Sequence, residues 1–217
     1  MKYALLSCHD EAYDKIAKLS FDSFVWFAEA HGIDYRPVFV DNLGPTPYLF
    51  KLGRVIRLLD DYDYVIYSDV DVLFNPGYKC REYNSTTSEF LKSDKPIMAS
   101  QDSLGLCAGF MTFRKDDSVL KLLEVWKTLG YMSERPPIRG DQSTLKLLVK
   151  NFKWIGDLVG LIPQTAVSNP ECGLRGSVAH HFWANGGSKF WGNMVKNEAQ
   201  LWADPVPTGP RSEPVIA

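Results

Sequence analysis

Two aspartates, Asp69 and Asp71, stand one residue apart at the end of an apolar, β-rich run that begins at Tyr64. Such a run is typical of a strand buried on both faces of a parallel sheet, and ligands of open α/β sheets bind beyond the carboxyl ends of these strands. Two carboxylates this close repel each other, and a proton or a cation relieves the repulsion. A hard divalent cation, which often bridges to substrate phosphates, is the natural occupant. Aspartates also form turns, and residues 75–77 are a turn signal, so the pair alone leaves both interpretations open.

The elements around this pair alternate between strand and helix. Strands are predicted at residues 2–7, 35–40, 64–74, 96–100, 107–113 and 177–183. Helices are predicted at residues 16–30, 48–59, 85–92, 116–130 and from Asp141 onward, which is expected to be an N-cap. Gly32 is the expected C-cap of the first helix, Gly109 indicates a close approach of backbone, and residues 152–162 are predicted as short strand and turn. The order favours an α/β fold with a doubly wound, mostly parallel central sheet flanked by helices.

Length and composition fit one folded domain. A chain of 217 residues with 45% hydrophobic and 13% aromatic residues buries a core and is not disordered. The net charge of -2 gives no basic excess, so nucleic acid is not an expected partner. No apolar run reaches the ~18 residues of a membrane span, and the start does not read as a signal peptide. The four cysteines form no CxxC pair, which argues against zinc and favours a reducing, cytoplasmic location.

Several separated patches together resemble one family. They are Leu6-Ser7-Cys8-His9-Asp10 with Tyr13, Lys51 on a helix, Asp69 and Asp71, Cys107-Ala108-Gly109-Phe110, Asp141-Gln142, and His181-Phe182 with Lys189-Phe190-Trp191. In order and spacing they are similar to the GT-A glycosyltransferases, nearest to the glycogenin and lipopolysaccharide-galactosyltransferase type, from Tyr3 to Trp191. The short chain with its proline-rich C-terminal segment also resembles the amino-terminal domain of a large glycosyltransferase from chlorella viruses. Cys107 stands where the family has asparagine, which leaves open whether a polar contact to sugar forms there.

The resemblance implies a metal-dependent transfer of sugar. The donor is expected to be a nucleotide diphosphate sugar, most directly a UDP-sugar such as UDP-glucose, and the acceptor a hydroxyl of a glycan or glycoprotein. Asp69, Asp71 and His181 are the implied ligands of Mn²⁺ or Mg²⁺, and mixed oxygen and imidazole ligands suit Mn²⁺ better than Ca²⁺. His180, as the neighbour of His181 on a strand, is expected to point to the opposite face.

The resemblance also implies residues for donor binding and catalysis. Donor-binding residues are expected to be Ser7, His9, Tyr13, Lys51, Arg54, Asp69, Val70, Gly109, Gln142 and Lys189. Asp141 and Asp102 are the catalytic candidates, with a plain helix cap as the alternative for Asp141. Lys51 and Arg54 are placed on the surface of their helix, where a solvated face is the alternative. One GT-A domain is predicted over residues 1–203, with a nucleotide-binding half at 1–100, an acceptor-side half at 101–203, and a proline-rich tail or linker at 204–217.

Two other functions compete with this one. A haloacid-dehalogenase-like phosphatase also places Asp-x-Asp after an apolar strand and would use Asp69 as its nucleophile. That motif usually follows the first strand of its domain, whereas two further strands are predicted before Asp69 here. A non-catalytic domain that binds nucleotide sugars is the third hypothesis, and Cys107 is the residue that suggests it.

Overall fold

The computed structural model describes residues 1–41, 47–74, 93–102, 105–132, 140–163, 166–168 and 179–182. Within these residues, a six-stranded sheet has the order β2-β1-β3-β6-β5-β7. Its strands are β1 (Tyr3–His9), β2 (Asp34–Phe39), β3 (Tyr64–Ser68), β5 (Ile97–Asp102), β6 (Gly105–Arg114) and β7 (Val159–Leu161). Within this sheet only β6 runs against its neighbours, because β1 pairs in parallel with β2 and β3, and β5 pairs in parallel with β7. The predicted mostly parallel α/β sheet is therefore confirmed.

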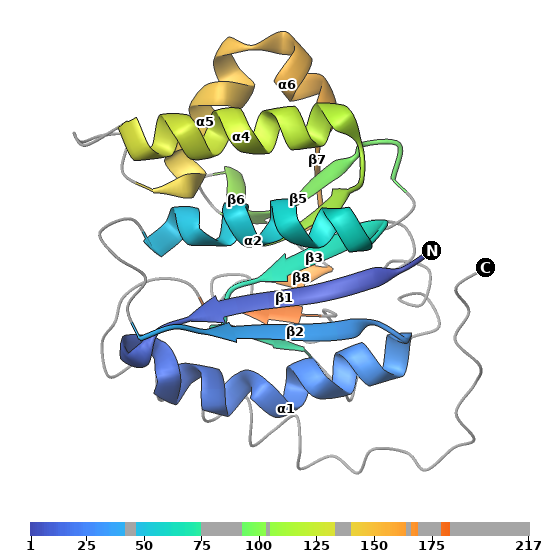
Figure 1. The fold of residues 1–217 in the computed structure, drawn as a ribbon, viewed down its shortest axis with the longest axis vertical. Coiled ribbons are helices and arrows are strands. Elements are labelled where there is room, and N and C mark those ends of the chain that lie inside the picture. The colour runs from blue at the N-terminus through green and yellow to red at the C-terminus, as the bar shows by residue number, and fades with distance from the viewer. Residues whose placement is uncertain are drawn as a thin grey trace.

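Helices cover both faces of this sheet (Figure 1). The helical elements are η1 (Glu11–Tyr13), α1 (Asp14–His31), α2 (Pro47–Asp61), α4 (Asp117–Met132), α5 (Asp141–Asn151) and α6 (Lys153–Leu158). Successive residues of β1 alternate between the faces, so Leu5 shares a core cluster with Phe24 of α1, whereas Leu6 shares one with Leu52 of α2 and Trp126 of α4. The central strands β1 and β3 are thereby buried on both faces, whereas β2 at the edge of the sheet stays largely exposed.

α1 ends as the sequence predicts. Gly32 has a φ of 62°, a left-handed conformation that a residue without a Cβ adopts at little cost. In this conformation the Ile33 N–H donates to the Ala28 carbonyl at 2.8 Å, which closes the last turn of the helix. The chain then enters β2 directly, and Ala4 of β1 pairs with Asp34.

The acidic pair separates two strands that lie in different sheets. After β3, the Val72 N–H donates to the Asp69 carbonyl at 3.2 Å, and β4 (Val72–Phe74) leaves the main sheet. β4 pairs antiparallel with β9 (Ala179–His181), which pairs in parallel with β8 (Val167–Ser168). The single strand predicted over residues 64–74 is therefore two strands, because the aspartates form a turn.

Two further local predictions are corrected by the structure. α5 does begin at Asp141, but its N-cap is Gly140, with a φ of 102°, and no side chain caps the helix. The predicted N-cap role of Asp141 is wrong because its carboxylate forms an ion pair with Lys51 instead. Residues 152–162 contain the helix α6 as well as the strand β7, because Ile155 turns inward and is buried in the core.

Several predictions lie outside the described residues. They are the helix at 85–92, the residues after Phe182 including Lys189, and the proline-rich tail at 204–217. The proposed division into halves at residues 100 and 101 also stays a prediction. None of the described helices combines the length and the apolarity that crossing a bilayer requires.

Candidate active site

Asp69 and Asp71 lie at the carboxyl end of β3, between the two sheets. The Tyr67 hydroxyl donates a hydrogen bond to Asp69 Oδ1, and the Asp69 N–H donates to the Gly109 carbonyl at 2.7 Å. The two carboxylate side chains are 37% and 20% exposed, so each keeps one side open to solvent. Burial raises the pKa of Asp69; the Lys51 ammonium opposes this shift and the Asp71 carboxylate adds to it. A cation beside both carboxylates would remove their repulsion.

His181 joins this pair through the second sheet. The register of β4 and β9 sets Val72 opposite His181, and the imidazole Nε2 lies 3.3 Å from Asp71 Oδ1. Burial opposes a charge on the ring, but the Asp71 carboxylate and the neighbouring Cys107 together outweigh burial and raise the pKa of His181 well above its ordinary value. One potential ligand atom from each of Asp69, Asp71 and His181 lies within 4.8 Å of the other two. The structure thus brings together the three residues that the sequence predicts as metal ligands.

The donor set fits a hard divalent cation. Two carboxylates and an imidazole are ligands that Mn²⁺ accepts, and Mg²⁺ shares the preference for carboxylate oxygen. Asp71 Oδ1 is buried and forms no hydrogen bond with the described residues, although the His181 Nε2 lies 3.3 Å away as an ion-pair partner. A buried anionic oxygen without a donor costs free energy, and a cation at this position would satisfy it.

Gly109 makes room for the imidazole. A Cβ placed on Gly109 would lie 2.1 Å from Cε1 and 2.5 Å from Nε2 of His181, so the ring packs directly on the backbone of β6. The close backbone approach that the sequence indicates at Gly109 is therefore present, and the group that approaches is His181. At the other edge of the ring, Cys107 Sγ lies 3.6 Å from Nδ1.

Lys51 is buried rather than exposed, which corrects the prediction that it lies on the surface of its helix. The residue is 5% exposed, and its Nζ donates to the Ala108 carbonyl at 2.8 Å. The same Nζ forms an ion pair with Asp141, lies 3.7 Å from Asp69 Oδ1, and sits 4.3 Å from the centre of the Tyr67 ring. Burial disfavours the charge, yet Asp141 and Asp69 outweigh burial and raise the pKa of Lys51. Helical periodicity could not reveal this position because both counter-ions come from distant parts of the chain.

Asp141 and Gln142 open α5 beside this lysine. Asp141 is 7% exposed, and its backbone carbonyl accepts a hydrogen bond from Trp126 Nε1 at 2.9 Å. The Ala108 N–H donates to Gln142 Oε1 at 3.2 Å, which ties α5 to β6. The Asp141 side chain thus lies in the first turn of α5 and against the Lys51 ammonium.

The residues near the carboxyl ends of β1 and β2 form a separate group. His9 pairs in register with Phe39 of β2, and the two rings lie 5.4 Å apart in an edge-on arrangement. Phe39 and Tyr13 are 53% and 51% exposed, so their rings are open to a ligand. Sequence reasoning missed Phe39, although the ends of adjacent parallel strands meet at one edge of the sheet. The Ser7 hydroxyl, in contrast, is buried and hydrogen-bonded to the Tyr35 hydroxyl at 2.9 Å.

The remaining predicted donor residues lie in different surroundings. Val70 is buried and shares a core cluster with Leu73 and Phe182, so its side chain serves packing. The Arg54 guanidinium lies 4.9 Å from the centre of the Phe50 ring on α2. Asp102 ends β5, and its side chain, like the whole of Lys189, is outside the described structure.

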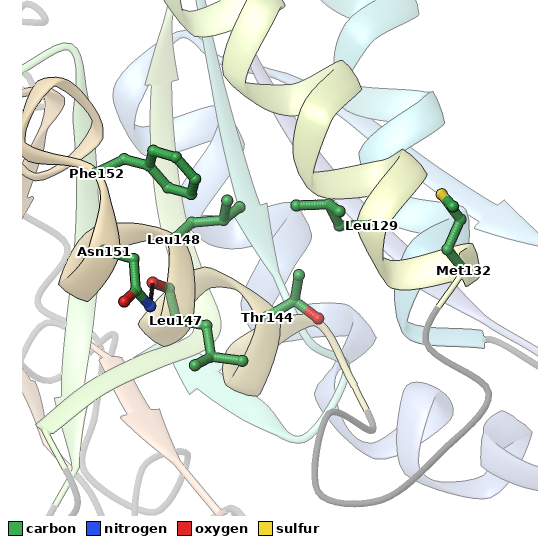
Figure 2. A pocket seen from close by; sticks show the side chains of 7 residues that line it. All are labelled: Leu129, Met132, Thr144, Leu147, Leu148, Asn151 and Phe152. Atoms are coloured by element: carbon green, nitrogen blue, oxygen red, sulfur yellow. Dashed lines mark hydrogen bonds between the residues drawn. The ribbon is translucent and has the colours of Figure 1, made fainter.

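A second surface feature is an apolar groove between α4 and α5 (Figure 2). The groove has a volume of about 480 Å³. It is lined by Leu129, Met132, Thr144, Leu147, Leu148, Asn151 and Phe152. Among the described residues that line it, none is charged and none is an aspartate described above, so this lining is unsuited to a diphosphate.

Solved structures share this fold. A glycosyltransferase involved in glycosylating the major capsid of the chlorella virus PBCV-1 aligns with a TM-score of 0.67 and 15% identity, covering 94% of this chain and 100% of that one. The galactosyltransferase LgtC, solved with donor and acceptor sugar analogues, aligns with a TM-score of 0.55 and 13% identity, covering 94% and 98%. The glycosyltransferase GlyE of Streptococcus pneumoniae TIGR4 aligns with a TM-score of 0.57 and 13% identity, and the match spans 62% of its chain. No curated protein sequence matches this chain.

A mostly parallel sheet with an Asp-x-Asp pair at its edge and these structural neighbours define the GT-A fold, as the resemblance implies. The chain belongs to the galactosyl transferase GMA12/MNN10 family, whose model matches residues 61–175, more than half of the chain. It is thus an enzyme that uses a nucleotide sugar as donor and a glycan as acceptor, and the phosphatase hypothesis is set aside. The match includes Asp69, Asp71 and Asp141 but ends before His181, whose assignment therefore depends on geometry.

Proposed function

We propose that this glycosyltransferase holds a divalent cation, Mn²⁺ or Mg²⁺, with Asp69, Asp71 and His181 while it transfers a hexose from a UDP-sugar to an acceptor hydroxyl. The observation that carries the proposal is the group of three ligand atoms within 4.8 Å of one another, together with the unsatisfied Asp71 Oδ1. When bound, the cation supplies positive charge to the departing diphosphate. The family description makes UDP-galactose the first donor to test beside UDP-glucose.

The protein's own residues prepare the site for donor and cation. The Tyr67 hydroxyl and the Lys51 ammonium both contact Asp69 Oδ1, which leaves Oδ2 for the cation. Lys51 also holds Asp141 next to Asp69, and from there Asp141 is proposed to bind a sugar hydroxyl or to act on the acceptor proton. Asp102 remains the second candidate for proton transfer.

The nucleotide is proposed to lie toward the ends of β1 and β2. The exposed rings of Tyr13 and Phe39 offer stacking surfaces. His9 ends β1, and its Nδ1 has no hydrogen-bond partner among the described residues. Ser7, Arg54, Val70, Gly109 and Gln142 stay donor-binding predictions, and Lys189 is proposed to add positive charge at the phosphates.

Substitutions at the three proposed ligands test the metal site. Asp71→Ala is expected to abolish Mn²⁺ binding in calorimetry and Mn²⁺-dependent release of UDP in turnover assays, and His181→Ala is expected to weaken both strongly. His180→Ala is the matched control, because His180 is the neighbour of His181 on β9. Its ring lies against the Phe182 ring, with 4.4 Å between the ring centres. Equal losses in the two histidine variants, or full activity in Asp71→Ala, would contradict the proposed ligands.

A melting-temperature screen identifies the donor. The protein is heated with UDP-galactose, UDP-glucose and other nucleotide sugars, each with and without Mn²⁺. A donor at a hundred times its dissociation constant adds about 2.7 kcal/mol of stability, which corresponds to roughly 5–10 °C for a chain of this size. The proposal requires stabilisation by a UDP-sugar that depends on Mn²⁺, and stabilisation that is independent of metal would overturn it.

A further inference from the structure

Cys107 lies beside the proposed metal ligand His181. The residue is 3% exposed, belongs to β6, and places its Sγ 3.6 Å from the His181 Nδ1, a distance at which nitrogen and sulfur share a hydrogen bond. Its own backbone carbonyl is engaged by the Ser100 hydroxyl at 3.3 Å, which helps to hold this part of β6. The thiol is therefore fixed against the histidine.

The described structure holds the His181 ring from three directions. The Gly109 backbone packs on the ring, Asp71 lies at Nε2, and Cys107 lies at Nδ1. A neutral imidazole that binds a metal through one nitrogen carries its proton on the other, and the partner of that N–H sets the tautomer and the ring orientation. In this geometry Nε2 faces the aspartates, so the proton belongs on Nδ1, next to the sulfur.

We propose that Cys107 is a positioning residue whose sulfur accepts a hydrogen bond from the Nδ1–H of His181 and so keeps the Nε2 lone pair directed at the cation. The inference rests on the proposed function, because it concerns a ligand of the proposed metal. The proposal thus gives Cys107 a role in orienting a metal ligand, at a position where the resembled family has an asparagine.

The strength of the effect follows from the chemistry of sulfur. Outer partners of metal-bound histidines typically change metal affinity 10–100-fold when they are removed, and most of them are carboxylates or carbonyls. A thiol is a weaker acceptor, so the expected loss is about 10-fold, at the lower end of this range. Serine keeps an acceptor at the same position, on a shorter bond, and is expected to recover part of the affinity.

Calorimetry with Mn²⁺ alone tests the inference on the full chain. Cys107→Val removes the acceptor at similar volume and is expected to weaken Mn²⁺ binding about 10-fold, with Cys107→Ser in between. Thr112→Val is the control, because Thr112 is also buried on β6 but lies five residues along the strand from Cys107, paired with Ile66 and Met98. In a His181→Ala background, Cys107→Val should leave the residual Mn²⁺ affinity unchanged. If Cys107 served packing alone, Cys107→Val would weaken Mn²⁺ binding in this background too. Melting temperatures without metal show whether each variant is folded.

The outcomes separate this inference from the proposed function. If the wild-type chain binds Mn²⁺ and loses it in His181→Ala, but Cys107→Val binds within twofold of wild type, the role of Cys107 is refuted and the metal site stands. If Cys107→Val and Thr112→Val weaken binding equally, the effect is one of packing and the inference is refuted as well. If the wild-type chain binds no Mn²⁺, the proposed function fails, and the role of Cys107 fails with it.

Discussion

Gly109→Ala places one methyl group against the imidazole of His181. The added carbon would lie 2.1 Å from Cε1 and 2.9 Å from Nδ1, far inside van der Waals contact. Gly109 is not among the glycines with a positive φ, so alanine suits its backbone conformation and the effect is purely steric. Either the ring leaves its position or the two sheets move apart. In both cases the 3.3 Å contact between His181 Nε2 and Asp71 Oδ1 is disturbed.

The expected magnitude follows from the overlap. Adding a methyl group to a well-packed interior costs about 1–3 kcal/mol. For a chain of this length, 1 kcal/mol shifts the melting temperature by roughly 2–4 °C, so a fall of roughly 2–12 °C is expected. Mn²⁺ affinity should drop at least about 10-fold, because the imidazole no longer meets the two aspartates in one geometry.

A double-mutant cycle attributes this cost to the ring. In a His181→Ala background the imidazole is absent, so Gly109→Ala should cost less than about 0.5 kcal/mol, which leaves a coupling energy of about 0.5–3 kcal/mol. Unfolding in urea measures the stabilities, and calorimetry measures Mn²⁺ binding. Gly53→Ala on α2 is the control, because a Cβ there meets no atom within 4 Å and alanine favours the helix by up to about 1 kcal/mol. An equal cost of Gly109→Ala in both backgrounds would refute the reasoning.

Three further predictions address charge, orientation and pH. Lys51→Met leaves the carboxylates of Asp69 and Asp141 without their shared cation. The free energy of unfolding in urea is expected to fall by about 3–5 kcal/mol, and adding Asp141→Asn should recover part of this loss. A Lys51→Met variant as stable as wild type would contradict the buried ion pair. Tyr67→Phe keeps the ring beneath the lysine but removes the hydrogen bond to Asp69, so Mn²⁺ affinity should fall about 10-fold in calorimetry; unchanged binding argues against this orienting role. Burial lowers the pKa of His31 below its ordinary value of 6.5. As pH falls below 6.5, His31 is therefore protonated in the unfolded chain before it is protonated in the folded one, and the contribution of neutral His31 to stability is lost. The stability advantage of wild type over His31→Gln should therefore shrink between about pH 7.5 and about pH 5, and an advantage that does not change with pH would show that this burial has no effect.

Local patterns predicted the elements of this fold well. Apolar periodicity located β1, α1, β2, α2 and β3 in order, and the glycine at residue 32 ends α1 as a left-handed cap. The same patterns misjudged residues 152–162, because a short apolar segment with one inward residue is compatible with strand or helix until packing selects between them. The N-cap prediction at Asp141 failed for a related reason: an aspartate at a helix start suits a cap, and here a distant lysine binds its carboxylate instead.

The sequence by itself determined the alternation of strands and helices, the acidic pair at the edge of the sheet, and a close backbone approach at Gly109. These features depend on residue type and on neighbours a few positions away, so they can be read along the chain. Tertiary structure alone decided that Lys51 is buried between Asp69 and Asp141, that Cys107 touches His181, and that the backbone at Gly109 receives this imidazole. Each of these contacts joins residues from different sheets or helices, and their burial and charge depend on partners that only strand pairing and helix packing bring within a few ångströms.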